Sequence, residues 1–493
     1  MSSPTVSIEG PTSTTSEGFL AAAKSGGCAP SSYGSSPTSP GDVDPAIWDK
    51  IKDHPCFSEE AHHYFARMHV AVAPACNVQC NYCNRKYDCA NESRPGVVSE
   101  KLTPDQALRK VIAVANEVPQ LSVLGIAGPG DACYDWEKTK ATFDRVIREI
   151  PDIKLCVSTN GLVLPDHVAE LAEMNVDHVT ITINMVDPEV GAKIYPWIFY
   201  ENRRYFGIEA ARILHARQML GLEMLSARGI LTKINSVMIP GVNDQHLFEV
   251  NKMVKERGAF LHNVMPLISD PAHGTHYGLI GQRGPTAMEM MALQDRLEGG
   301  AKLMRHCRQC RADAVGLLGE DRGQEFTLDG IPDDVTYDAG KRQAYRQVVA
   351  HERRDHEAAR SEAIGMVKAT DSEKSLLVAV ATKGGGRVNE HFGHAKEFQV
   401  YEVSPRGISL VGHRKVERYC LGGGGEDATL EGVFAALEGI HIVLCAKIGN
   451  RPKEQLSRAG LRVTDAYGHD YIETAVSALY AAEFGIRPLA ATA

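Results

Sequence analysis

The hydrophobic pattern of the first two thirds of the chain alternates between short β-rich runs and helical segments. Six runs rich in β-branched and other apolar residues recur along it, at 69–74, 120–127, 152–158, 178–184, 230–239 and 259–268. The first helical segment between them has a start signal, Thr103 followed by Pro104. Its apolar residues Leu108, Val111 and Ala115 share one face. Strands that alternate with helices predict parallel βα units.

The number and spacing of these units favour one α/β fold. Six units follow one another, and no Gly-x-Gly-x-x-Gly follows the first strand, which disfavours a Rossmann fold. We therefore predict a partial (β/α)6 TIM-type barrel at 46–339, with ligands at the C-terminal ends of its strands. Residues 48–67 are predicted to form a helix that leads into the first strand.

The remaining segments differ from this pattern in composition. Residues 1–45 are dominated by Ser, Thr, Pro and Gly, which predicts a disordered tail. Residues 340–374 are highly charged and predict a solvated helical linker. Strand-like runs return at 376–381 and 398–401, within a small C-terminal α/β domain predicted for 375–493.

Composition and charge narrow the function classes. The chain has 493 residues, enough for two or three domains. Its 53 basic and 62 acidic side chains give a net charge of -9, which disfavours a nucleic acid partner. No run approaches the ~20 apolar residues of a membrane helix, and the N-terminal residues lack a signal peptide pattern. We expect a cytoplasmic protein with no membrane partner.

Cysteines introduce the candidate chemistry. Twelve cysteines without an export signal indicate metal or redox chemistry rather than a disulfide framework. Cys76, Cys80 and Cys83 follow the first predicted strand with Cys-x3-Cys-x2-Cys spacing. Three thiolates can hold three irons of a cubane and leave the fourth iron open for a substrate. A zinc knuckle is the alternative, because zinc also binds thiolates.

Polar residues close four later strands, in segments 127–131, 158–161, 180–184 and 235–241. Amide and hydroxyl groups there could hydrogen-bond a ribose or a carboxylate at the barrel mouth. The alternative is that Asn and Gly end these strands because they form turns.

The cysteine spacing resembles that of the radical S-adenosylmethionine (SAM) superfamily, in which the open iron binds the amino and carboxylate groups of SAM. The resemblance implies a set of residues close to SAM: Tyr82, Gly130, Asn160 and Thr182. The turn that contains Gly130 is similar to the family's loop for the SAM amino group, although its acidic residue, Asp131, is displaced.

A second cysteine pair, Cys307 and Cys310, lies further along the chain. Two thiolates cannot complete a cubane or a tetrahedral zinc site, and Cys56, Cys89 and Cys133 remain as partners. We infer one or two further clusters near the first.

Residues 54–97 and 307–316 together resemble the NifB family of nitrogenase cofactor biosynthesis proteins, and the resemblance covers residues 45–490. It implies a radical SAM enzyme that fuses two [4Fe-4S] clusters, while SAM supplies a central carbon and a 5'-deoxyadenosyl radical. The implied product is NifB-co, the [8Fe-9S-C] precursor of the nitrogenase iron-molybdenum cofactor.

The resemblance also implies roles for individual residues. Cys76, Cys80 and Cys83 would hold the SAM-binding cluster. The two substrate clusters would be held by a further set: Cys56, Cys89, Cys133, Cys307, Cys310 and His54. Glu92 and Arg94 would assist proton removal, with a surface salt bridge as the alternative.

The C-terminal domain carries its own resemblance. Segment 389–395 is similar to the cofactor-carrying family that includes NifX. This implies product contacts at His391, His394 and Cys420, and ordinary loop residues are the alternative. The implied partners are an electron donor such as ferredoxin or flavodoxin, iron–sulfur cluster donors, and downstream carrier and scaffold proteins.

Two other functions fit parts of the sequence. One is a radical SAM enzyme with auxiliary clusters that modifies a peptide or RNA, although the acidic balance disfavours RNA. The other is an iron–sulfur scaffold or carrier that passes clusters on unchanged. The three-cysteine spacing, which leaves one iron open, disfavours the carrier. Cleavage of SAM to 5'-deoxyadenosine would distinguish an enzyme from a carrier.

Overall fold

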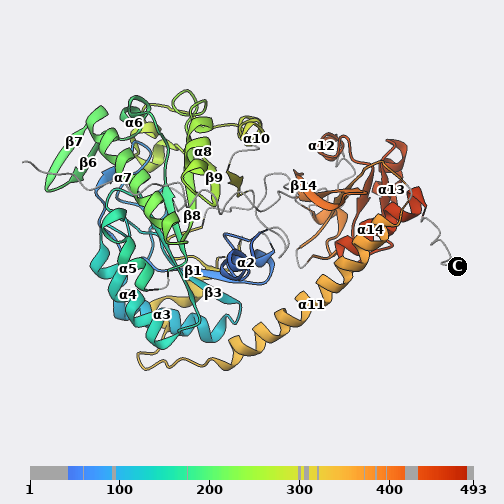
Figure 1. The fold of residues 1–493 in the computed structure, drawn as a ribbon, viewed down its shortest axis with the longest axis horizontal. Helices are drawn as coiled ribbons and strands as arrows, with labels where there is room; N and C mark the ends of the chain where they lie inside the picture. Colours follow the sequence, from blue (N-terminus) through green and yellow to red (C-terminus); the bar gives the residue numbers. More distant parts are fainter. Residues whose placement is uncertain are drawn as a thin grey trace, which may run out of the picture. The chain divides into compact units, whose positions relative to one another are not determined.

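The computed structural model describes most of the chain (Figure 1). The described residues are 43–58, 60–91, 96–174, 176–297, 301–304, 310–318, 321–370, 372–383, 386–395, 397–416 and 431–485. The predicted tail lies almost entirely outside them. Four predicted site residues also lie outside the described residues: Glu92, Arg94, Cys307 and Cys420.

One eight-stranded sheet organises what we call the parallel-sheet domain. Its strand order is β10-β9-β8-β5-β4-β3-β1-β11, and every neighbouring pair is parallel except β1 with β11. The strands are β1 (Ala66–His69), β3 (Leu121–Ile126), β4 (Lys154–Thr159), β5 (His178–Thr182), β8 (Leu231–Met238), β9 (Leu261–Pro266), β10 (Lys302–Leu303) and β11 (Val315–Gly316). The six predicted strands are thereby confirmed as a parallel α/β fold. The curvature of this sheet into a partial barrel stays a prediction.

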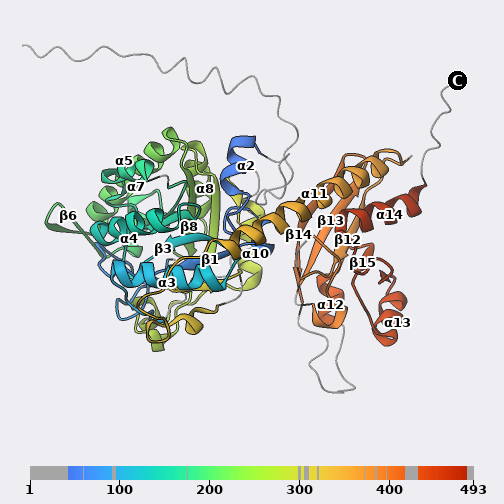
Figure 2. The same cartoon turned by 90° about the horizontal axis from the view of Figure 1, so that it is seen from below.

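Helices connect successive strands of this sheet (Figure 2). α3 (Pro104–Glu117) begins as predicted, because the Thr103 hydroxyl accepts the N–H of Gln106 at 3.3 Å and the Gln106 side chain accepts the N–H of Thr103 at 2.8 Å. Its Val111 and Ala115 are fully buried in the core between sheet and helices. The other helices of the domain are α2 (Pro45–Ile51), α4 (Trp136–Glu149), α5 (Val168–Glu173), α6 (Pro188–Ile194), α7 (Gly207–Ala227), α8 (Leu247–Glu256), α9 (His276–Leu279) and α10 (Ala287–Arg296).

The predicted helix at 48–67 is wrong over most of its length. α2 ends at Ile51, and the chain then turns, with the N–H of His54 bonded to the Ile51 carbonyl at 2.8 Å. Pro55 explains the difference, because it has no N–H and disfavours helical geometry at the residue before it. The turn brings His54 and Cys56 toward the sheet.

The first strand ends earlier than predicted. β1 stops at His69, and beyond it Ala71 and Ala73 form isolated bridges rather than a continuous ladder. Because regular pairing ends here, the following residues can form the cysteine-containing loop.

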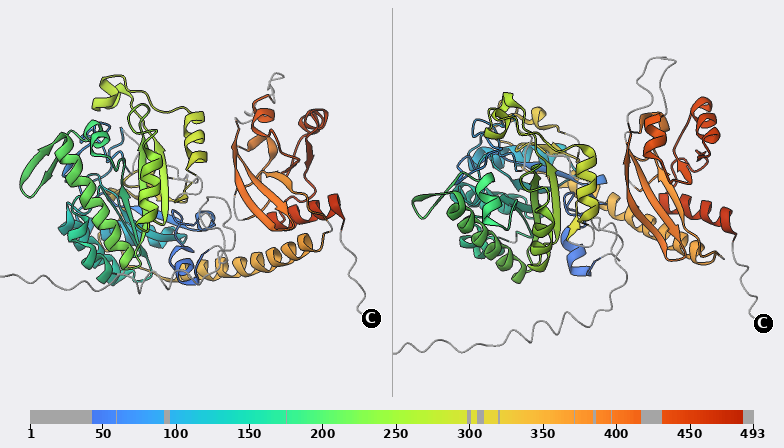
Figure 3. Two further views of the ribbon diagram at one scale, coloured as in Figure 1. Left: turned by 45° about the horizontal axis from the view of Figure 1, so that its top comes forward. Right: turned by 90° about the horizontal axis from the view of Figure 1, so that it is seen from above.

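A small three-stranded sheet, which the sequence analysis did not predict, lies beside this loop. Its strands are β2 (Val78–Gln79), β6 (Trp197–Tyr200) and β7 (Arg203–Phe206), in the order β2-β6-β7. Glu201 and Asn202 connect β6 to β7 with φ of 47° and 58°, which gives a tight hairpin. The hairpin projects from the edge of the parallel-sheet domain (Figures 1 and 3).

The charged segment forms one long helix, α11 (Gly340–Lys368). Its Arg342 is fully buried and donates to the carbonyl oxygen of Leu121 at 3.1 and 2.9 Å. Arg342 also pairs with Asp152 at 2.9 Å. One face of this helix is therefore packed rather than solvated.

A five-stranded sheet forms the C-terminal domain (Figure 3). Its order is β14-β13-β12-β15-β16, with antiparallel pairing from β12 to β14 and parallel pairing from β12 to β16. Its elements are β12 (Leu376–Val380), β13 (Glu397–Ser404), β14 (Gly407–Lys415), α12 (Glu431–Ala436), β15 (Ile442–Leu444), α13 (Asn450–Arg458), β16 (Arg462–Thr464) and α14 (Ile472–Phe484). The predicted runs at 376–381 and 398–401 correspond to β12 and β13, within the expected mixture of strands and helices. Throughout the described residues, no helix combines the length and apolar character needed to cross a membrane.

Candidate functional site

The loop after β1 carries Cys76, Cys80 and Cys83, which we call the cysteine loop. Side chains within the loop close it on itself. The Gln79 amide donates to the carbonyl oxygens of Cys80 and Cys83, at 3.0 and 3.1 Å. Arg85 donates to the carbonyl oxygen of Cys76 at 2.8 Å. These hydrogen bonds within the chain define the backbone of the loop.

Three asparagines, two that follow β4 and β5 and one within β8, bind this loop through their side-chain N–H groups: Asn160 to Asn77 at 2.9 Å, Asn184 to Tyr82 at 2.6 Å and Asn235 to Asn91 at 3.2 Å. The sequence analysis expected strand-end amides to contact a ribose or a carboxylate. In the structure, these three amide groups brace the cysteine loop.

The turn after β3 approaches the cysteine loop closely at Gly130. A Cβ atom at this position would lie 2.5 Å from the carbonyl oxygen of Pro74 and would also collide with the carbonyl oxygen of Ala75. The carboxylate of Asp131 accepts the N–H of Asn160 at 2.6 Å and the hydroxyl of Thr159 at 3.1 Å. Asp131 therefore joins the turn after β3 to the end of β4.

Two other residues expected near SAM are buried. Tyr82 is 1% exposed, and its hydroxyl donates to Asn91 at 2.6 Å. Thr182 lies at the end of β5 and is 2% exposed. The structure thus places Tyr82, Gly130 and Asn160 in or against the cysteine loop, and Thr182 at a neighbouring strand end.

Burial shifts the pKa values of the thiols in the cysteine loop. It raises the pKa of Cys76 to about 12, and it raises the pKa of Cys80 and Cys83 as well. Burial, followed by the neighbouring cysteines, also raises the pKa of Cys89. Iron binds the deprotonated thiolate, so bound iron would provide the positive charge that stabilises it here.

A cavity inside the parallel-sheet domain brings together Cys56, Cys156, Cys310 and His69. These four come from the segment before β1, from β4, from the segment before β11 and from β1. Other polar residues also line it: His54, Arg67, Lys233 and Asn235. Because Asn235 also binds the cysteine loop, the cavity adjoins that loop.

His69 has a ring nitrogen with a lone pair that is available to bind a metal. Its Nδ1 lies 3.1 Å from the carbonyl oxygen of Arg311, which can only accept, so Nδ1 carries the proton and Nε2 keeps its lone pair. Burial, with a further effect of Arg67, lowers the pKa of His69 to about 4, which keeps the ring neutral. A Cβ atom on Gly125 would lie 2.6 Å from this ring, so the glycine makes room for it.

Cys310 is held by a buried cation. Arg67 is 2% exposed and donates to the sulfur of Cys310 from Nε at 3.2 Å and from Nη2 at 3.1 Å. Its Nη1 donates to the carbonyl oxygens of Gly316 and Leu317. The sulfur of Cys310 is thereby fixed at the cavity.

Known proteins match this chain over its whole length. Residues 70–254 match the family model of the radical SAM superfamily, and residues 374–482 match the one described as dinitrogenase iron-molybdenum cofactor. The FeMo cofactor biosynthesis protein NifB of Sinorhizobium fredii is 76% identical over 494 residues, 100% of each chain. That of Azotobacter vinelandii is 55% identical over 468 residues, 92% of this chain and 93% of that protein. The chain belongs to the NifB family.

Membership of the NifB family confirms the expected resemblance and the role in FeMo cofactor biosynthesis. The radical SAM match implies one [4Fe-4S] cluster and SAM. Among solved structures, Streptococcus suis SuiB bound to S-adenosylmethionine is 14% identical, with a TM-score of 0.33 over 59% of each chain. A likeness at this level supports no functional inference.

Two residues that the sequence analysis missed in this NifB family member are His69 and Cys156. A sequence signal existed for both. Arg67 and His69 alternate on an otherwise apolar strand, as Cys156 and Ser158 do, and alternate strand residues face the same side. Polar residues at that spacing on buried strands indicate a polar interior.

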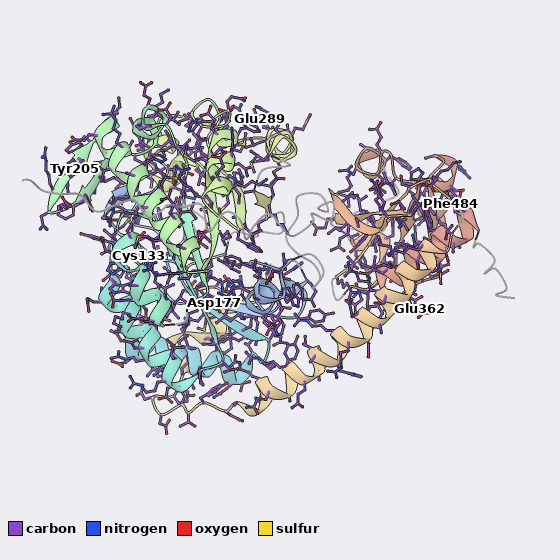
Figure 4. All side chains as sticks on the ribbon, viewed as in Figure 1. Cys133, Asp177, Tyr205, Glu289, Glu362 and Phe484 are labelled. Atoms are coloured by element: carbon purple, nitrogen blue, oxygen red, sulfur yellow. The ribbon has the colours of Figure 1, made fainter. Side chains whose placement is uncertain are left out.

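His54 and Cys133 differ in their relation to the cavity. His54 lines it, with Nδ1 accepting the N–H of Cys56 at 3.2 Å and the ring 4.3 Å from that of His178. Cys133, labelled in Figure 4, is 1% exposed and belongs to the hydrophobic core. Cys133 is therefore a small buried thiol, and its place as a ligand stays a prediction.

The described residues contain no group of three or more His, Cys, Asp or Glu side chains that converge on a single metal ion. A cubane cluster does not require such convergence, because each thiolate binds a different iron. Cys89 lies beside the turn after β3, where a Cβ atom on Gly128 would be 3.6 Å from its own Cβ.

In the C-terminal domain of this NifB family member, His391 and His394 form a pair. Their ring centroids lie 4.7 Å apart. Nδ1 of His391 accepts the N–H of Gly393 at 3.0 Å, and His394 is exposed. A contact of this pair with product stays a prediction.

Proposed function

We propose that the chain fuses two [4Fe-4S] substrate clusters around a carbon derived from SAM, giving NifB-co, the [8Fe-9S-C] precursor of the iron-molybdenum cofactor. The observation that carries the proposal is the cavity beside the cysteine loop, where three thiols and an imidazole from four separate segments meet. A radical SAM enzyme that modifies a peptide and holds auxiliary clusters is the second candidate, and it would put no label from SAM into a cluster. The parallel sheet would form the partial (β/α)6 barrel that encloses both sites.

The SAM-binding cluster would be held by Cys76, Cys80 and Cys83. When bound, this cluster and SAM supply a carbon-centred radical and a methyl group. SAM would lie against a set of residues in and around the cysteine loop: Tyr82, Gly130, Asn160 and Thr182. The chain's task is positioning, since the buried walls around the loop exclude water and other hydrogen donors.

One substrate cluster would bind Cys56, His69 and Cys310, with Cys307 from outside the described residues completing the set. Cys156 lines the same cavity and Cys89 lies beside the cysteine loop, which supports the proposal that both would hold the second cluster. Arg67 and Lys233 would offset the negative charge of thiolate-bound clusters. Glu92 and Arg94 would assist proton removal.

Anaerobic reconstitution tests this function. The holo chain is given dithionite and methyl-labelled SAM, and 5'-deoxyadenosine, S-adenosylhomocysteine and label in an extracted cluster are measured. Carbon insertion predicts all three products, which Cys76→Ala abolishes together. His69→Ala should keep 5'-deoxyadenosine formation while label in the cluster falls.

Cys445→Ala is the matched control, because Cys445 is also a buried thiol but lies in the C-terminal domain. It should leave all three products in place. Formation of 5'-deoxyadenosine without label in a cluster would reject carbon insertion. Absence of both nucleoside products would leave a metal-binding scaffold.

The C-terminal domain would receive the product and present it to downstream carrier and scaffold proteins, and His391, His394 and Cys420 would contact the cluster. Its match to the iron-molybdenum cofactor family supports this role. Iron–sulfur cluster donors would load the substrate sites, and a ferredoxin or flavodoxin would supply electrons. Transfer of labelled product to a carrier should fall when residues 374–493 are removed.

A further inference from the structure

The hairpin of β6 and β7 is attached directly to the cysteine loop, yet the proposed reaction gives it no role. β6 pairs with β2, which lies between Cys76 and Cys80. The N–H of Phe199 also donates to the carbonyl oxygen of Asn77 at 2.7 Å. The hairpin therefore lies next to the residues that would hold the SAM-binding cluster.

The two faces of the hairpin differ in what they contact. Ile198 is fully buried on one face, where Tyr200 and Tyr205 pack against the same core cluster (Tyr205 is labelled in Figure 4). Alternate residues of a strand point to opposite faces. The pairing of β6 with β7 therefore places four residues on the outer face: Trp197, Phe199, Arg204 and Phe206.

Two guanidinium groups lie over Trp197. Arg204 is 4.6 Å from its ring centroid, and Arg85 is 5.1 Å from it. Both arginines are exposed, and within the described residues no ion pair involves either of them. Phe206 is 60% exposed. We define the basic aromatic patch as Arg85, Trp197, Phe199, Arg204 and Phe206.

The charge of this patch is opposite to that of the whole chain. The chain has a net charge of -9, and the one acidic residue within the hairpin itself is Glu201, at its turn. A local basic surface on an acidic protein selects an acidic partner and repels a second copy of the same chain. Arginine and aromatic side chains are also the types enriched at protein interfaces.

We propose that the basic aromatic patch docks a small acidic electron-transfer protein that reduces the cluster held by Cys76, Cys80 and Cys83. This inference rests on the proposed function, because each SAM cleavage consumes one electron. In the transfer, the donor protein is oxidised by one electron and the cluster gains that electron, with no bond formed or broken and no proton moved. The patch suits this task because it adjoins the cysteine loop and is small, as surfaces for transient redox encounters are.

The test compares two reductants on the reconstituted holo chain. A reduced bacterial ferredoxin of net negative charge requires docking, whereas dithionite does not. Arg204→Glu should lower the ferredoxin-driven rate of 5'-deoxyadenosine formation about fivefold or more at low ionic strength. It should leave the dithionite-driven rate unchanged. Added salt should slow the wild-type chain more than the variant, because salt screens the steering charges.

Three further variants sharpen the result. Arg204→Lys keeps the charge and should keep most of the ferredoxin-driven rate. Phe206→Ser removes an exposed aromatic contact and should lower that rate without changing its salt dependence. Arg406→Glu is the matched control, because Arg406 is an exposed arginine at the turn of the β13–β14 hairpin, in the C-terminal domain. It should behave as the wild type.

The proposal is wrong if Arg204→Glu matches the wild type with ferredoxin. It is also wrong if this variant lowers the ferredoxin-driven and dithionite-driven rates equally, because the patch would then act on the cysteine loop itself. A change of oligomeric state in sedimentation would refute it as well, because a second copy of the chain would then be the partner. A wild-type chain inactive with both reductants would refute the proposed function instead. Calorimetric titration of the ferredoxin into wild type and Arg204→Glu would still decide on the docking.

Discussion

The guanidinium of Arg67 and the sulfur of Cys310 are joined by two N–H donors, although 243 residues separate them in the chain. A hydrogen-bond donor aimed at a sulfur fixes its position, and donors to the sulfurs that hold a cluster tune that cluster. Arg67 lies on β1 two residues before His69, so one strand positions two parts of the same cavity. These hydrogen bonds connect β1, the strand before the cysteine loop, to Cys310 of the second cysteine pair.

Arg67→Gln should therefore weaken binding of the proposed substrate cluster at Cys310. Binding of the proposed SAM-binding cluster should not change. Outer contacts of this kind typically change metal affinity about 10- to 100-fold. Iron retained after a chelator challenge measures the effect, with electron paramagnetic resonance reporting each cluster. Arg67→Lys keeps the charge but not the forked geometry, and should retain an intermediate amount of iron. Equal retention in Arg67→Gln and wild type would contradict this assignment.

Gly130→Ala should destabilise the chain even without a cluster. The added methyl group would meet the carbonyl oxygens of Pro74 and Ala75, which are backbone atoms and cannot move aside locally. We expect a loss of about 2–4 kcal/mol in the free energy of unfolding, measured with urea. Gly365→Ala is the control, since no atom lies within 4 Å of the new methyl group in α11. It should be neutral or stabilising by up to about 1 kcal/mol.

Arg342→Ala should be among the most destabilising changes in α11. It leaves the carbonyl oxygen of Leu121 without its two donors and opens a large cavity in the core, while Asp152 keeps its ion pair with Arg346. The expected loss is about 3 kcal/mol or more. Arg354→Ala removes an exposed arginine of the same helix and should change stability by less than about 0.5 kcal/mol. Similar unfolding curves for the two variants would show that the Arg342 contacts contribute little.

The ion pair of His356 with Glu473, at 2.8 Å, should make stability depend on pH. Burial lowers the pKa of His356, but Glu473 outweighs it and holds the pKa above 6.5. Burial likewise raises the pKa of Glu473, and His356 outweighs it and holds the pKa below 4.5. The contribution of His356 is lost as pH rises through its raised pKa, and that of Glu473 as pH falls through its lowered pKa.

The pair should thus stabilise the fold fully between pH 4.5 and 6.5. His356→Gln should cost about 2 kcal/mol in that window and progressively less at higher pH. Urea unfolding across the pH range measures the difference. His351→Gln, a change at an exposed histidine of the same helix, is the control. A difference that grows with rising pH would refute the assigned sign.

The sequence predicted the parallel sheet because its strands are buried on both faces and read as apolar runs. It misplaced the helix at 48–67. The helical pattern of polar and apolar residues continues past Pro55, although the backbone turns there. It also missed the hairpin of β6 and β7, whose two strands are short and whose turn, Glu201-Asn202, lacks the usual glycine.

Within the proposed site, the prediction for Cys76, Cys80 and Cys83 rests on spacing alone, because the three lie within one loop. Cys56, Cys156 and Cys310 meet only through the fold, so sequence alone could not place them in one cavity. The protonated nitrogen of His69 depends on the carbonyl oxygen of Arg311, a contact between distant segments. Such tertiary contacts have no local signature.

The three asparagines that brace the cysteine loop have a consequence for how the protein is made. Their hydrogen bonds run within the chain, so we expect them to form without iron. In zinc fingers, by contrast, the ligands become ordered only with the metal, and starvation unfolds them. A cell short of iron would therefore accumulate this protein in a folded form, and cluster loading could follow synthesis at any later time.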